Sequence, residues 1–303
     1  MVGYCMDGRD VFSGYHPVVN FIYFMLMLLF AMCFLHPVSL GISLAAALLY
    51  ALQLKGRKAV GRTLLFLVPM LLLAALLNPV FNHEGVTILC YLPTGNPLTL
   101  ESILYGFAAA VMLACVIFWF VCYSAVMCSD KFIYLFGRII PALSLVLSMA
   151  LRFIPRFKLQ LQTVIEAQRC VGRDMGSGSV FQRMKYAMGV CSILITWALE
   201  TAIETADSMK SRGYGLPGRT AFSIYRMEKR DKKMLVWLIG CGAVIFVSWA
   251  AGLFTWRYYP TVQQLAVTPT AVLAQVVYLS LCATPVLLNQ REGKACTPIK
   301  LKG

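Results

Sequence analysis

Two short segments of the chain end in the same pattern, which is a basic residue, a small residue, any residue and then glycine. They are Arg169-Cys170-Val171-Gly172 and Lys210-Ser211-Arg212-Gly213. Glycine commonly follows the last residue of a helix, and cations favour a helix C-terminus, so each pattern predicts a helix end. That preference alone can account for either pattern. An arginine fixed at an exposed helix end also suits paired hydrogen bonds with a carboxylate, so we expect these ends to recognise an acidic partner.

The residues before each pattern predict an amphipathic helix that positions it. From Arg156 to Cys170 the apolar positions are Phe157, Leu161, Val164, Ile165 and Cys170. From Ile195 to Ser211 they are Leu199, Ala202, Ile203, Ala206 and Met209. A second stripe of this helix contains Glu200, Glu204, Asp207 and Ser211. We expect the apolar stripes to pack the helices against each other or against the rest of the protein, and the carboxylates to pair with nearby Lys or Arg.

The composition indicates a membrane protein. The chain has 303 residues, of which 59% are hydrophobic and 13% charged, with a mean hydropathy of +0.73. A soluble domain has about a quarter charged residues, whereas lipid can cover an apolar exterior. Six stretches are long and apolar enough to predict membrane spans: Val18 to Leu35, Val38 to Leu54, Leu64 to Val80, Ile103 to Ala125, Leu235 to Phe254 and Val267 to Leu288.

The positive-inside rule orients these spans. The net charge is +14, from 27 Lys and Arg against 13 Asp and Glu. The predicted loop from Lys55 to Arg62 is basic, the loop from Phe81 to Ser102 has no Lys or Arg, and the tail has basic residues at Arg291, Lys294, Lys300 and Lys302. Six spans with both termini in the cytoplasm satisfy all three. The charge therefore needs no nucleic acid partner.

More than half of the basic residues lie between the fourth and fifth spans. Seven fall from Arg152 to Lys185 and eight from Lys210 to Lys233. Both clusters should be cytoplasmic, so the stretch from Tyr186 to Met209 cannot cross the bilayer once, and its carboxylates would be costly at mid-bilayer. We expect long helices along or below the cytoplasmic face. The preceding stretch from Phe132 to Phe153, with Arg138 and Pro141, predicts an interfacial helix and a short re-entrant or broken piece.

This region resembles the T component of energy-coupling factor (ECF) ABC transporters, a family that includes the Q-type cobalt-transport membrane proteins. Leu151-Arg152-Phe153-Ile154-Pro155 is similar to the family's Arg-Phe-Ile-Pro segment. Glu166-Ala167-Gln168, with the basic-small-X-Gly end that follows it, is similar to the first Ala-Arg-Gly coupling motif. Ala206-Asp207-Ser208-Met209-Lys210-Ser211-Arg212-Gly213-Tyr214 is very close to the second, A-D-x-M-x-A-R-G-Y.

The resemblance implies a non-catalytic scaffold that binds two ABC ATPase subunits and a small S component, which captures a vitamin or metal ion. In the second motif Arg212 and Gly213 match the family's residues and Ser211 stands for alanine. In the first, Cys170 stands for alanine and Gly172 matches, but Val171 occupies the arginine position, so Arg169 or Arg173 is expected to replace it. The supporting residues of the coupling helices are Arg152, Pro155, Glu166, Ala206 and Asp207.

We therefore expect an all-α protein of a bacterial inner membrane, with about six transmembrane helices and long cytoplasmic amphipathic coupling helices. Residues 1–130 would hold the first four spans, 131–233 the coupling region, and 234–303 the last two spans with the basic tail. No cofactor is expected, and with no CxxC pair among the 11 cysteines a zinc site is not expected either. The S component, and not this chain, would select the substrate.

Two other functions compete with this interpretation. A self-contained channel or carrier would be expected to place ionisable residues inside its spans, but the six spans are almost free of charge. A membrane enzyme acting on lipid would need clustered Asp, His or Ser on one face, and only the stripe of Glu200, Glu204 and Asp207 is available. The concentration of charge in the predicted cytoplasmic helices favours a coupling subunit.

Overall fold

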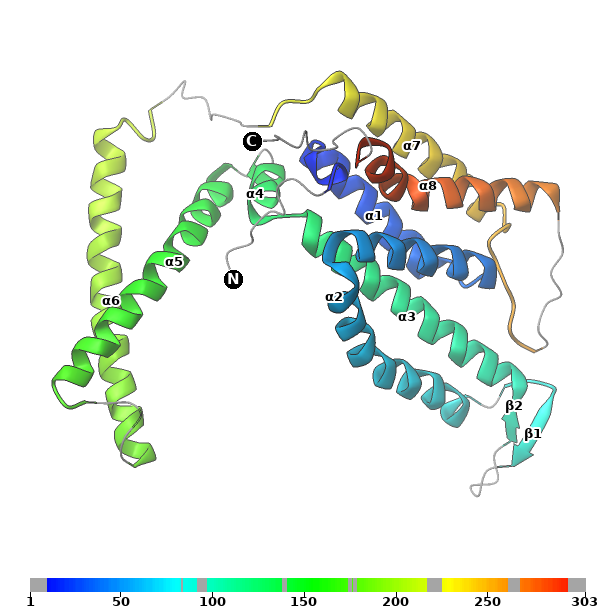
Figure 1. Ribbon diagram of the computed structural model, residues 1–303, viewed down its shortest axis with the longest axis horizontal. Helices are drawn as coiled ribbons and strands as arrows, with labels where there is room; N and C mark the ends of the chain where they lie inside the picture. Colours follow the sequence, from blue (N-terminus) through cyan, green and yellow to red (C-terminus); the bar gives the residue numbers. More distant parts are fainter. Residues whose placement is uncertain are drawn as a thin grey trace, which may run out of the picture. The chain divides into compact units, whose positions relative to one another are not determined.

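The protein, seen here as a computed structural model, forms two compact units, which we describe separately (Figure 1). The described residues are 10–82, 84–91, 97–137, 141–173, 176, 179–216, 225–260 and 268–293. The bundle unit comprises Gly3–Phe132 and Tyr225–Gly303, and the helix-pair unit comprises Ile133–Ile224. Of the basic residues used above, Arg138, Arg219, Lys294, Lys300 and Lys302 lie outside the described residues.

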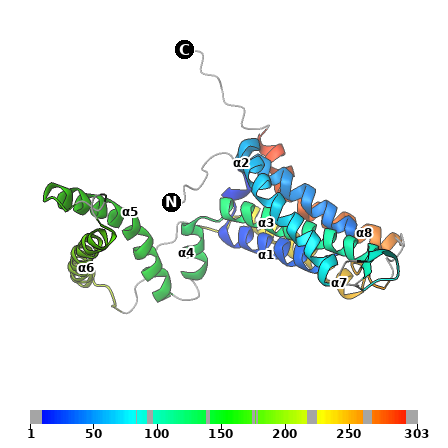
Figure 2. The ribbon, with the colours of Figure 1, turned by 90° about the horizontal axis from the view of Figure 1, so that it is seen from below.

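The bundle unit is almost entirely helical, as predicted. It contains the 3₁₀ turn η1 (Phe12–Gly14), α1 (Pro17–Cys33), α2 (Pro37–Phe81), α3 (Leu100–Val126), the start of α4 (Ser129–Gly137), α7 (Lys229–Ala250) and α8 (Pro269–Gly293). An antiparallel hairpin of β1 (Ile88–Tyr91) and β2 (Pro97–Thr99) lies between α2 and α3. Figure 2 shows α1, α2, α3, α7 and α8 running side by side. The all-α membrane class is thereby confirmed.

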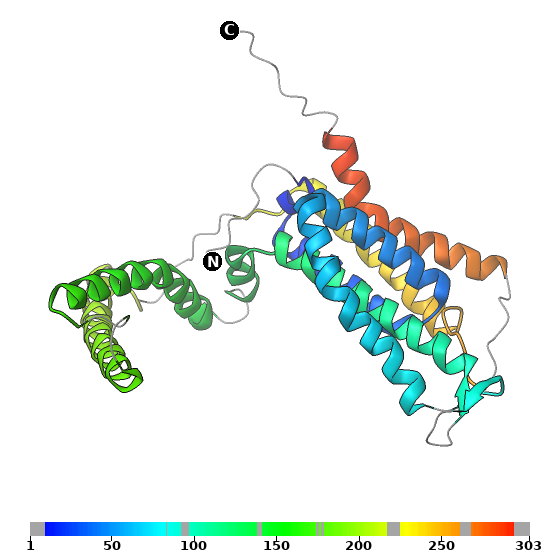
Figure 3. The same ribbon diagram turned by 60° about the horizontal axis from the view of Figure 1, so that its bottom comes forward.

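The six predicted spans correspond to α1, the two arms of α2, α3, α7 and α8. By length and composition, α2, α3, α7 and α8 can each cross a membrane, and α1 is a shorter apolar helix of 17 residues. The predicted loop from Lys55 to Arg62 is wrong. Helix α2 is interrupted only at Gly56, where φ is 76° and ψ is 166°, and it resumes at once. One glycine with a positive φ, which residues with a side chain rarely adopt, is enough to bend the chain sharply (Figures 1 and 3).

The core of the bundle unit is aromatic. Its largest fully buried side chains include Trp119 from α3, Tyr23 from α1, Tyr50 from α2 and Tyr278 from α8. The Trp119 indole donates a hydrogen bond of 2.9 Å to the Ser43 hydroxyl. Aromatic rings from four helices and their satisfied polar atoms therefore hold the bundle together.

The helix-pair unit consists of the end of α4, then α5 (Pro141–Cys170) and α6 (Val180–Ser211). The stretch that was expected to form an interfacial helix and a broken piece contains most of α4 and the first half of α5. Its placement at the membrane interface stays a prediction. The first coupling helix was expected to begin near Arg156. Helix α5 begins earlier, at Pro141, and includes Pro155 in its interior. A proline removes one helical hydrogen bond without necessarily ending the helix. The second begins at Val180, earlier than the expected Ile195.

Helix α6 is also long and apolar enough to cross a membrane. Its placement at the cytoplasmic face, which the basic residues on both sides of it favour, therefore stays a prediction.

Candidate functional site at two helix ends

Helix α5 ends in a Schellman motif, the hydrogen-bonded cap that closes many helices. The amide of Gly172 donates to the carbonyl of Arg169 (3.0 Å), and the amide of Arg173 donates to that of Gln168 (2.9 Å). The φ angle of Gly172 is +78°, a left-handed conformation that residues with a side chain rarely adopt. The predicted helix end at Val171-Gly172 is thereby confirmed.

Helix α6 ends in the same motif. The amide of Gly213 donates to the carbonyl of Lys210 (2.9 Å), the amide of Tyr214 donates to that of Met209 (3.0 Å), and φ of Gly213 is +72°. The hydrogen bonds therefore align the two ends residue by residue, with Gly172 on Gly213, Val171 on Arg212 and Cys170 on Ser211. The same register pairs Arg169 with Lys210, as the sequence pattern predicts, and Arg173 with Tyr214.

Both ends present their side chains to solvent. Arg169, Cys170, Arg173, Ser211 and Arg212 are all exposed, and Val171 is 70% exposed. The Ser211 hydroxyl donates to the carbonyl of Ser208 at 2.9 Å, so it stays on its own helix. Because the carbonyls at a helix C-terminus carry partial negative charge, the cations there are stabilised locally while their outer surfaces remain accessible.

A small apolar contact positions α5 against α6. Val164, Val190 and Leu194 are buried in one cluster, with Leu161 and Ile165 packed against it. The rings of Phe157 and Trp197 lie 6.2 Å apart, and the Arg156 guanidinium carbon lies 5.9 Å from the Trp197 ring centre. Leu161, Val164 and Ile165 of the predicted apolar stripe therefore pack as expected. Phe157 is 39% exposed beside Trp197, and Cys170 is exposed.

The predicted stripe of α6 does not pack on α5. Leu199 and Ile203 are 62% and 65% exposed, because α5 contacts the part of α6 around Val190 to Trp197. The expected ion pairs of Glu200, Glu204 and Asp207 are also missing from the described part of the chain. These three carboxylates are exposed. The second half of α6 therefore presents both of its stripes to its surroundings.

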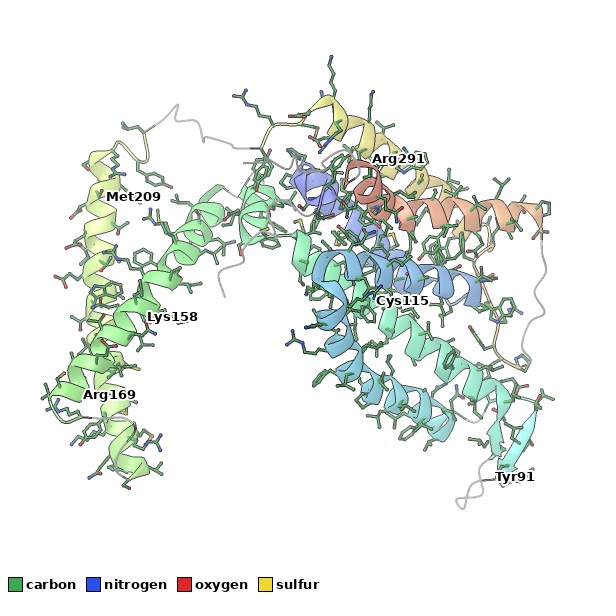
Figure 4. All side chains as sticks on the ribbon, in the orientation of Figure 1. Tyr91, Cys115, Lys158, Arg169, Met209 and Arg291 are labelled. Atoms are coloured by element: carbon green, nitrogen blue, oxygen red, sulfur yellow. The ribbon has the colours of Figure 1, made fainter. Side chains whose placement is uncertain are left out.

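The register of the packed residues makes α5 and α6 antiparallel, since Phe157 meets Trp197 and Val164 meets Val190. The C-terminus of α5 consequently lies beside the beginning of α6, and the C-terminus of α6 lies at the opposite end of the pair (Figure 1). Figure 4 shows this through the labelled residues Arg169 and Met209. At 1.5 Å per residue, the two ends are up to about 40 Å apart.

The predicted supporting residues fall into three groups. Glu166 is exposed one turn before the end of α5, and Ala206 and Asp207 are exposed one turn before the end of α6. Arg152 and Pro155 lie about four to five turns before the end of α5 and belong to neither end. Pro155 lies in the interior of α5, two residues before Phe157, which contacts Trp197.

Comparison with known proteins identifies the family. A model of a family described as cobalt transport protein (CbiQ) matches residues 9–222, more than two thirds of the chain. The chain belongs to this family. The match includes α1 to α6 and both helix ends, whereas α7 and α8 lie outside it. This CbiQ-family protein therefore contains the candidate site within the part that the family model matches.

Curated relatives carry the name energy-coupling factor transporter transmembrane protein EcfT. That of Lacticaseibacillus paracasei is 41% identical over 90 residues, 29% of this chain and 34% of the relative. That of Lactobacillus helveticus is 36% identical over 98 residues, 32% and 35% of the two chains. That of Bacillus subtilis is 34% identical over 105 residues, 34% and 40% of the two chains. The matches span well under half of each relative. They confirm the resemblance to the T component.

Proposed function

We propose that this CbiQ-family protein is the transmembrane T component of an ECF-type importer. In this role it is a non-catalytic subunit that couples two ABC ATPase subunits, which hydrolyse ATP, to a small membrane S component, which binds a vitamin or a metal ion. The family match and the names of the relatives support a transporter membrane component. The coupling role depends on the two helix ends.

The observation that carries the proposal is the equivalence of these ends. Two helix ends are closed by the same pair of hydrogen bonds and expose cations, and they lie at opposite ends of one antiparallel pair. A single partner surface could not easily contact both ends at once over such a distance. Two similar acidic grooves, one on each of two related subunits, fit this arrangement, because each groove receives one helix end.

The structural register also suggests which cation replaces the arginine missing at Val171. Arg169 corresponds to Lys210, so a cation stands at that position in both ends. Arg173 corresponds to Tyr214 and is the additional cation of the α5 end. We assign the compensating role to Arg173, which directly follows Gly172.

The membrane orientation follows from the same proposal. Lys55, Arg57, Lys58 and Arg62 flank or lie within the bend of α2, and Arg291 lies near the end of α8. The positive-inside rule places these residues in the cytoplasm of a bacterial cell, together with both termini and the helix-pair unit. The proposal includes no nucleic acid partner.

The test is purification of the tagged full chain with its co-expressed ATPase subunits. The wild-type protein should retain both ATPases, and Arg212→Glu should lose them, because reversing one charge of a docked pair leaves a carboxylate facing a carboxylate. Lys158→Glu is the matched control, since Lys158 is an exposed cation of the same unit outside both ends. Normal ATPase retention by Arg212→Glu, or substrate transport by the chain alone in liposomes, would refute the proposal.

A further inference from the structure

The N-terminal turn, residues 10–16, is bound to the bundle through buried polar groups. Asp10 is 8% exposed, and its carboxylate accepts hydrogen bonds from the Tyr50 hydroxyl (3.0 Å), the Ser13 amide (3.0 Å) and the Asn289 side chain. The amide of Val11 donates to the Asn289 side-chain oxygen at 3.0 Å. Tyr50 belongs to α2 and Asn289 to α8, so the turn is fixed on two helices of the bundle.

The same turn binds the point where the chain leaves the bundle unit. Lys131, in the first turn of α4, is only 5% exposed. Its ammonium group donates to the carbonyls of Ser13 and of Val126, the latter at 3.1 Å and at the last residue of α3. With the Asn20 amide oriented to donate to the Phe12 carbonyl, its oxygen also accepts from Lys131 at 3.2 Å. Three acceptors match the three donors of the ammonium group, which offsets the cost of its burial.

The turn also binds the point where the chain returns. Asp231, in the first turn of α7, is 6% exposed. Its carboxylate accepts from the amide of His16 (3.3 Å) and from the amide of Glu228 (3.0 Å). The neighbouring Arg230 places its guanidinium carbon 4.2 Å from the centre of the Tyr15 ring, a cation–π contact. The first turn of α7 is therefore held to Tyr15 and His16, at the other end of the N-terminal turn.

The two crossing points are also close to each other. Burial, together with the charge of Asp130, raises the pKa of Tyr225, the residue at which the bundle unit resumes. The chain thus leaves the bundle at residues 130–132 and returns at residues 225–231, beside the same seven-residue turn. Lys131 and Asp231 are separated by 100 positions in the sequence, and both bind this turn.

We propose that Lys131 and Asp231 are positioning residues that fasten both connections of the helix-pair unit onto the N-terminal turn. A connection passes on a displacement only if its far end is fixed. Here each connection ends in a buried, charge-assisted contact, and the turn between them is fixed to α2 and α8. Residues 10–16 would thus form the common base from which the helix-pair unit acts on the bundle. This inference rests on the proposed coupling function.

The variants are chosen to separate positioning from stability. Lys131→Met keeps the aliphatic stem but removes all three donors, and Lys131→Arg restores the charge and the donors. Asp231→Asn keeps the shape of Asp231 and weakens its two contacts. Lys232→Met is the matched control, because Lys232 is an exposed cation next to Asp231. Tyr50→Phe removes only the hydroxyl that binds Asp10. This variant replaces Lys131→Met in the measurements if Lys131→Met does not fold.

The first measurement is substrate transported per ATP hydrolysed, by the complete complex in proteoliposomes. A purely structural defect lowers transport and ATP hydrolysis together and leaves their ratio unchanged. We expect the ratio to fall by about tenfold in Lys131→Met and in Asp231→Asn, the factor by which loss of one charge-assisted hydrogen bond typically shifts an equilibrium. Lys131→Arg should recover most of the ratio, and Lys232→Met should match the wild type.

The second measurement does not depend on ATPase partners. Hydrogen–deuterium exchange of the purified full chain in detergent should accelerate at residues 10–16, 129–132 and 225–231 in Lys131→Met, Asp231→Asn and Tyr50→Phe. Unchanged exchange there, or an unchanged transport-to-ATP ratio, would overturn the inference. If the wild-type chain binds no ATPase, the proposed function fails, and the exchange experiment alone then decides whether the turn fastens both connections.

Discussion

Replacing Arg173 with Glu should weaken ATPase binding more than replacing Arg169 with Glu. Both side chains are exposed, so neither substitution buries a charge. The two arginines occupy different positions in the hydrogen-bond register. Arg169 corresponds to Lys210, so both helix ends have a cation there. Arg173 corresponds to Tyr214, so only the α5 end has a cation there. If Arg173 supplies the charge missing at Val171, reversing it removes the main contact of the α5 end.

The size of the effect follows from the exposure of the site. A hydrogen bond to a charged group contributes about 1.5–3 kcal/mol, which corresponds to about 10- to 150-fold in Kd. Exposed charges are screened by salt, which favours the lower part of this range. We expect Arg173→Glu to raise the Kd for the ATPase subunit by about 10- to 30-fold, and Arg169→Glu by about fivefold or less, since a helix-end charge alone contributes about 0.3–1 kcal/mol.

A second substitution provides the internal control. Val171 occupies the register position of Arg212 and is 70% exposed, so Val171→Arg loses little burial and places a guanidinium where the other end has one. In the Arg173→Glu background it should restore the Kd to within about threefold of wild type. The assay is binding of purified ATPase subunits to the chain in lipid nanodiscs at fixed salt. Normal binding by Arg173→Glu, or failure of Val171→Arg to restore it, would show that the register argument is wrong.

Two further predictions concern the architecture that supports the ends. Gly172→Ala and Gly213→Ala should each destabilise their caps by about 1 kcal/mol, because alanine disfavours left-handed φ. Gly213→Ala should cost more, since its Cβ would lie 3.0 Å from Leu216 Cδ1 whereas Gly172 has open space. The measurement is hydrogen–deuterium exchange. The Arg173 amide should exchange faster in Gly172→Ala, and the Tyr214 amide should exchange faster in Gly213→Ala. Trp197→Leu should loosen the α5–α6 contact by about 1–2 kcal/mol, by losing the Phe157 ring contact and the Arg156 cation–π contact. Exchange at Val164 and Val190 should rise, and the control Trp237→Leu, on an exposed face of α7, should leave it unchanged.

The sequence predicts the helices well where a local pattern determines them. Both Gly-terminated ends are found at the residues where the pattern placed them, because the Schellman cap depends on the glycine and its immediate neighbours. The apolar spans follow equally from composition. The extent of the helices is less predictable, since Pro155 lies within α5 and a single residue, Gly56, bends α2.

Contacts between distant residues could not be predicted from the sequence alone. Which stripe of α6 is covered depends on where α5 crosses it, and that is set by Val164 meeting Val190 and by Phe157 meeting Trp197. Similarly, Lys131 and Asp231 resemble ordinary surface charges in the sequence. Their burial depends on a turn more than 100 positions before the first of them. The docking residues themselves stay a prediction until their binding is measured.

The position of the α5–α6 contact has a mechanical consequence. From the centre of the contact to the end of α5 is about 14 Å, and to the end of α6 about 26 Å, at 1.5 Å per residue. The pair is therefore a lever with unequal arms. If it pivots at the centre of the contact, the two ends swing in opposite directions, and the end of α6 sweeps almost twice the arc of the end of α5. Two similar subunits pressing on the ends would produce a torque, and the subunit that holds α6 would have to travel farther.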